Sequence, residues 1–136
     1  MVPQTEQYLG ELRCKAVHGP SQVELITDAP TDNYGRGESF SPTDLVVTAL
    51  VTCKLTTMAL FAHHDNVKLD GTKACAEKHM STDPPRRIVR IVVRVDCPRG
   101  IPRAYREKLE YVARTCPVAK SLHPDIVLDV TFIYPD

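Results

Sequence analysis

The feature that most constrains the fold is a long apolar run over residues 42–66. Pro42 suits the first position of a helix, and Ser41 with Asp44 has the spacing of a capping box, so the run is predicted to form one helix. Its apolar side chains go nearly all the way round, which indicates a helix buried on all sides. At about 1.5 Å per residue the helix would be about 37 Å long. We therefore expect a second copy of the chain to help bury it.

Length and composition indicate one globular domain over residues 1–136, because 43% of the residues are hydrophobic and 25% are charged. The 17 Lys and Arg residues balance 17 Asp and Glu residues, which argues against a nucleic-acid partner. The polar start of the chain does not resemble a secretory signal. Asp44 and Lys54 bracket an apolar run that is too short to cross a bilayer. We therefore expect a cytoplasmic protein with no membrane partner.

The other elements follow from hydrophobic periodicity and turn residues. Strands are predicted over residues 7–17, 22–27, 67–80, 88–95 and 126–134, and helices over 102–115 and 117–122. The first two strands form an N-terminal hairpin that turns at His18, Gly19 and Pro20. The order predicts an α+β fold in which a sheet packs on the long central helix.

Five cysteines are present, at positions 14, 53, 75, 97 and 116. Their odd number and the absence of a Cys-x-x-Cys pair favour free thiols in a reducing compartment over a disulfide framework or a structural zinc site. Cys116 precedes Pro117 at the predicted N-cap of a helix, where backbone N–H groups favour a thiolate. An alternative is a buried apolar cysteine that completes a stripe with Tyr105, Leu109 and Val112.

Cys53 lies well inside the long helix, where the helix dipole has little effect on it. A core cysteine is again the alternative, and Lys54 is expected to point about 100° away. His64 shares a face with Cys53 but lies about 16 Å along the helix, and His63 lies on another face. We therefore expect no metal site there.

Two blocks of the chain resemble the OsmC/Ohr family. The first is Ser-Pro-Thr-Asp-Leu at residues 41–45 followed by Ala-Leu-Val-Thr-Cys at 49–53, and the second is Thr-Cys-Pro-Val-Ala-Lys-Ser-Leu at 115–122. They look like the family's proline-led helix with its first cysteine and its second cysteine with the Cys-Pro-Val signature. The predicted element order also matches the family over nearly the whole chain.

The resemblance implies an intertwined homodimer in which Cys53 and Cys116 approach each other at the subunit interface. It implies thiol-dependent reduction of small-molecule organic hydroperoxides. Cys53 would attack the peroxide and become a sulfenic acid, and Cys116 would resolve it as a disulfide. An external dithiol reductant would regenerate both thiols, and no metal or organic cofactor is needed.

The chain departs from the family's peroxidases at two places. Thr43 stands where those proteins have a Glu, and the predicted hairpin turn at His18 lacks their Arg. An Arg beside a cysteine lowers the pKa of the thiol, and the Glu holds that Arg. Asp44 is the candidate replacement for the Glu. Arg36, or His18 when protonated, is the candidate for the positive charge.

Two other functions fit the same dimeric fold. In the first, the protein would be a redox sensor or would bind a small hydrophobic or thiol-containing ligand, without efficient peroxidase turnover. Alternatively, it is a stable dimer with two inert cysteines, which thiol labelling of the native protein would distinguish.

Overall fold

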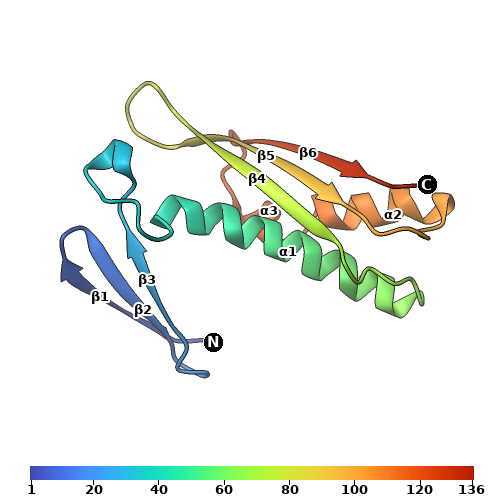
Figure 1. Cartoon of the computed structure of the whole chain (residues 1–136), viewed down its shortest axis with the longest axis horizontal. Coiled ribbons are helices and arrows are strands. Elements are labelled where there is room, and N and C mark those ends of the chain that lie inside the picture. Colours follow the sequence, from blue (N-terminus) through green and yellow to red (C-terminus); the bar gives the residue numbers. More distant parts are fainter. The chain divides into compact units, whose positions relative to one another are not determined.

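A computed structural model describes all residues from Met1 to Asp136, and the α+β fold is confirmed. The chain divides into two compact units, Met1–Val46 and Val47–Asp136, so the expectation of one domain over residues 1–136 stays a prediction. The elements, labelled in Figure 1 where there is room, are β1 (Gln4–Gly10), β2 (Arg13–His18), β3 (Glu24–Asp28), the 3-10 helix η1 (Thr31–Asn33), α1 (Pro42–His64), β4 (Lys73–Met80), β5 (Ile88–Asp96), α2 (Arg103–Arg114), α3 (Pro117–Ser121) and β6 (Val127–Ile133).

The first unit contains an antiparallel sheet with the strand order β1-β2-β3. The prediction of one strand over residues 7–17 is wrong, because the chain turns between β1 and β2. Gly10, Glu11 and Leu12 all have positive φ angles, of 86°, 53° and 62°, which an extended strand does not allow. The turn at His18 is therefore the second of two hairpin turns.

The second unit contains a sheet with the order β4-β5-β6. β5 pairs antiparallel with β4 and parallel with β6, and the connection from β5 to β6 runs through α2 and α3, as parallel strands require. The predicted alternation in β5 is confirmed, since Ile91, Val93 and Val95 are buried while Arg90 and Arg94 are exposed. Helices α1 and α2 lie against the same face of this sheet (Figure 1).

The predicted strand over residues 67–80 is wrong in its first half, because β4 begins only at Lys73. The N–H of Val67 donates to the carbonyl of Ala62 at 2.8 Å, and Gly71 has a φ of +86°. Residues 67–72 are therefore the turn that leaves α1. The other predicted elements have ends that agree with the structure to within two residues.

Helix α1 buries one stripe of side chains within its own chain. Leu50, Lys54, Met58 and Ala62 are its buried residues, spaced four apart, as one face of an α-helix requires. By length and composition alone α1 also resembles a membrane-spanning helix, with 28% of its most apolar window buried. This likeness is weak evidence for a membrane, because the core helix of a soluble protein passes the same test.

Candidate functional site

The two cysteines of the family resemblance lie together within one chain. Cys53 is half-buried on α1, and Cys116 is fully buried between α2 and α3. Cys53 packs against the core cluster that contains Cys116, and the neighbouring Cys53 side chain contributes to the raised pKa of the Cys116 thiol. Both residues belong to the second unit, so their proximity follows from the packing of α1 against the end of α2.

Cys116 is the N-cap of α3, as predicted, with Pro117 at the start of that helix. The prediction that this position favours a thiolate is wrong within the single chain. Burial raises the pKa of the Cys116 thiol above its ordinary value, although the N–H of Ala119 and the charge of Lys54 act in the opposite direction. Removal from water opposes the charged form of a thiol, and in this site that cost exceeds the effect of one short helix.

Cys116 also completes the predicted stripe of α2. Leu109 and Val112 are buried in the same core, and Tyr105 packs against it. The two alternatives for Cys116 are therefore both correct in their geometry, since it is an N-cap and a core residue together. The fully buried thiol leaves Cys53 as the more exposed member of the pair.

Lys54 is the residue that the sequence reasoning missed. Its side chain is 1% exposed, and its Nζ donates a hydrogen bond of 2.9 Å to the carbonyl oxygen of Ala113. Lys54 points about 100° away from Cys53 around the helix axis, and this direction places its side chain in the core. Its four-residue spacing from Leu50 and from Met58 was the available signal, because those residues lie on the same helix face.

Burial lowers the pKa of Lys54, since a buried ammonium loses its hydration. The charges of Cys116 and Cys53 raise this pKa, whereas the nearby Arg114 lowers it. The site therefore contains two thiols and one amine, removed from water to different extents, whose protonation states depend on one another.

The two candidates for activating the thiol lie in the first unit. Asp44 and Ser41 form the predicted capping box: Asp44 Oδ2 accepts the N–H of Ser41 at 2.9 Å, and Ser41 Oγ accepts the N–H of Asp44 at 3.1 Å. Arg36 is 61% exposed and forms an ion pair with Glu11 at 3.7 Å.

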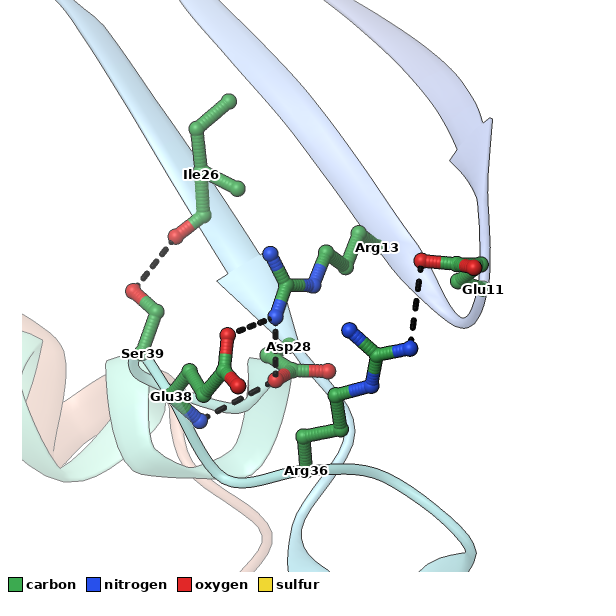
Figure 2. Close-up of polar contacts among 7 residues, drawn as sticks. All are labelled: Glu11, Arg13, Ile26, Asp28, Arg36, Glu38 and Ser39. Atoms are coloured by element: carbon green, nitrogen blue, oxygen red, sulfur yellow. Dashed lines mark hydrogen bonds and ion pairs between the residues drawn. The ribbon is translucent and has the colours of Figure 1, made fainter.

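A second arginine, Arg13, follows the β1–β2 turn and was not singled out from the sequence. Figure 2 shows its guanidinium pointing to Asp28 and Glu38. The carboxylate of Asp28 is 1% exposed and also accepts the backbone N–H of Glu38 at 3.0 Å. That backbone bond and the charge of Arg13 lower the pKa of Asp28 despite its burial. The strand predicted over residues 7–17 contained Arg13, whereas in the structure this residue begins β2 directly after a turn.

His18, at the second hairpin turn, is exposed, and its Nδ1 lies 2.5 Å from Ser21 Oγ. His63 and His64 are exposed at the end of α1. The structure contains no group of three or more His, Cys, Asp or Glu side chains arranged to hold a metal ion.

Comparison with known proteins identifies the family. A family model described as OsmC-like protein matches residues 35–131. A search of curated proteins gave no match to this chain. Among solved structures, a Psychrobacter arcticus 273-4 protein, named as a proposed osmotic stress induced and detoxification response protein, is 40% identical with a TM-score of 0.92. The match covers 98% of this chain and 96% of that protein.

Two more distant structures show the same fold. The organic hydroperoxide resistance protein OsmC of Legionella pneumophila is 14% identical with a TM-score of 0.75, covering 100% of this chain and 97% of that one. The organic hydroperoxide resistance protein OhrB of Bacillus subtilis is 14% identical with a TM-score of 0.69, covering 99% and 98%. Because the family model spans residues 35–131, the chain belongs to the OsmC-like protein family.

Proposed function

We propose that this protein is a thiol-dependent peroxidase that reduces organic hydroperoxides. The observation that carries the proposal is that Cys53 and Cys116 are neighbours at the same core cluster, because two neighbouring thiols need only a small shift to form a disulfide. The organic hydroperoxide resistance proteins with the same fold support the choice of substrate class.

The half-buried Cys53 is assigned the attack, since a peroxide reaches it more easily than the fully buried Cys116. The Cys53 thiolate attacks the O–O bond, which breaks to leave a sulfenic acid on Cys53 and release the alcohol. Cys116 then attacks the sulfenic sulfur, forming the disulfide and releasing water. An external dithiol reduces the disulfide by exchange and returns both thiols to the reduced state.

Arg36 is proposed to supply a positive charge beside the Cys53 thiol. Asp44 is proposed to hold the Arg36 guanidinium in place. Arg36 is suited to this role because its ion pair with Glu11 is long and exposed, so the guanidinium is able to exchange partners. Asp44 already contributes to α1 through the capping box. Removal of this carboxylate therefore affects the start of α1 as well as any charge at the site.

We further propose that the active form is a homodimer within the cytoplasm. One side of α1 in the second unit is exposed but carries no Asp, Glu, Lys or Arg. We call it the open face, and it consists of Ala49, Thr52, Thr56, Ala59, Leu60 and His63. Leu60 alone is 56% exposed. An uncharged helix face with small residues suits close packing against a second helix.

The test is to treat fully reduced protein with one equivalent of an organic hydroperoxide and to locate disulfides by peptide mass spectrometry. We expect a Cys53–Cys116 disulfide that a dithiol reverses. The Cys53→Ser variant should lose peroxide consumption, whereas Cys75→Ser should retain it, because Cys75 is an exposed cysteine outside the pair. Undiminished turnover by Cys53→Ser, or scattered oxidation that also includes Cys14, Cys75 and Cys97, would rule out the mechanism.

A second candidate is a redox sensor or a small-ligand-binding protein. The raised pKa of the buried Cys116 favours it, because a mainly protonated resolving thiol closes the disulfide slowly and so limits turnover. A bound hydrophobic or thiol-containing molecule that copurifies with the protein, together with negligible turnover, would support this candidate over the peroxidase.

A further inference from the structure

Lys54 is the buried titratable group that the two-thiol mechanism leaves unused. A lysine side chain is rarely fully buried unless it has a partner, yet Lys54 is 1% exposed and has the neutral carbonyl of Ala113 as its hydrogen-bond acceptor. An ammonium has three N–H donors. The Ala113 carbonyl does not neutralise an ammonium, so a charged Lys54 would need a neighbouring group that becomes negative.

The neighbours of Lys54 identify that group. Ala113, in the last turn of α2, lies three residues before Cys116, and Lys54 itself follows Cys53 in α1. The charge of Cys116 and, to a smaller extent, that of Cys53 would raise the pKa of Lys54. The other charged neighbour is Arg114, whose guanidinium is directed to the carbonyl of Val130 at 3.1 Å and to Glu110 at 3.7 Å. Arg114 is positive, so it disfavours a permanently charged Lys54.

We propose that Lys54 is a proton-transfer residue that carries the proton of the Cys116 thiol to the oxygen that leaves Cys53 when the disulfide closes. The proposal rests on the proposed peroxidase function. The Lys54 amine takes the Cys116 proton, and the resulting thiolate attacks the sulfenic sulfur of Cys53. The S–O bond breaks, and the ammonium gives its proton to the departing hydroxide.

The step is balanced without another reagent. One thiol and one sulfenic acid become one disulfide and one water, and Lys54 returns to the amine from which it began. Burial, which opposes the free thiolate and the free ammonium, favours both the amine and the thiol at the start. A lysine with a lowered pKa is suited to reversible proton transfer near neutral pH.

The first experiment measures removal of the Cys116 proton without any peroxide. In a Cys14→Ser/Cys75→Ser background, Cys53 reacts with the aromatic disulfide dithionitrobenzoate, and Cys116 then expels a second, coloured thionitrobenzoate. This leaving group needs no proton, so its release reports the attack by Cys116. We expect Lys54→Met to slow the second release by about 100-fold and to remove one inflection from its pH profile.

Two controls separate proton transfer from charge and from folding. Lys54→Arg keeps a positive charge but cannot release its proton, so its pH profile should lack the same inflection as that of Lys54→Met, although its charge lowers the pKa of the Cys116 thiol. Lys120→Met, an exposed lysine on α3, should close at the wild-type rate. A wild-type rate in Lys54→Met, or a wild-type pH profile in either Lys54 variant, would overturn the proposal. The circular dichroism spectrum of each variant checks its fold.

The second experiment uses an organic hydroperoxide and a reagent that traps sulfenic acids. Lys54→Met should form the Cys53 sulfenic acid at the wild-type rate but accumulate it, because the disulfide closes slowly. If the wild-type protein forms neither a sulfenic acid nor a Cys53–Cys116 disulfide with the hydroperoxide, the peroxidase function fails. The thionitrobenzoate release still decides the role of Lys54 in that case.

Discussion

A charge placed on the open face of α1 should dissociate the proposed dimer. We choose Ala59→Glu, because Ala59 is exposed in the single chain and lies among uncharged neighbours. Moving a carboxylate out of water into an interface costs several kcal/mol. Two-fold symmetry places the change in both subunits. A lower limit of about 2 kcal/mol per copy therefore gives about 4 kcal/mol, or about 1000-fold in the dimer Kd.

Sedimentation equilibrium over a range of protein concentrations measures this change directly. The matched control is Ala104→Glu, which introduces the same side chain at an exposed position of α2 and should leave the dimer intact. The reasoning is refuted if Ala59→Glu associates as tightly as Ala104→Glu. It is equally refuted if the wild-type protein sediments as a single chain at all concentrations.

Three further predictions concern stability and ionisation. Leu109→Ala removes a fully buried side chain of the core and should lower the free energy of unfolding in urea by about 2–5 kcal/mol, whereas Tyr111→Ala at an exposed site should change it little. The lowered pKa of Asp28 means that its stabilisation is complete above its unfolded value of about 3.9. This stabilisation is lost as the pH falls through the folded value. Acid unfolding followed by circular dichroism should therefore show a weaker pH dependence in Asp28→Asn. Burial and the hydrogen bond to Asp65 raise the pKa of Tyr105 to about 12, so stability should fall as the pH rises from about 10 towards that value. In Tyr105→Phe an ultraviolet absorbance titration should lose the tyrosine absorbance change that the wild-type protein shows near pH 12.

The main elements and the pair of cysteines could be predicted from the sequence because their signals are local. Pro42 and the Ser41–Asp44 capping box define the start of α1, and the structure confirms both bonds. The alternation in β5 and the stripe along α2 follow from burial on one side of each element. The family resemblance then pairs Cys53 with Cys116, and the structure brings these residues together.

The features that the sequence did not reveal depend on contacts between distant segments or on unusual backbone angles. The β1–β2 turn has positive φ at Glu11 and Leu12, which are residue types that seldom mark such a turn. The predicted strand over residues 7–17 therefore contained Arg13. The burial of Lys54 depends on the end of α2, which is 59 residues away in sequence. Composition alone favours an exposed lysine.

The different exposure of Cys53, Cys116 and Lys54 accounts for the role proposed for each of them. The half-buried Cys53 is open to a small molecule, while the fully buried Cys116 is protected from it. That protection raises the pKa of Cys116, which would make it a slow resolving thiol by itself. A basic group that has also been removed from water overcomes this problem, because proton transfer between Cys116 and Lys54 creates both charges together rather than either one alone. The same burial that makes Cys116 a weak acid thus accounts for the proposed function of Lys54, in which all three residues take part in closing the disulfide.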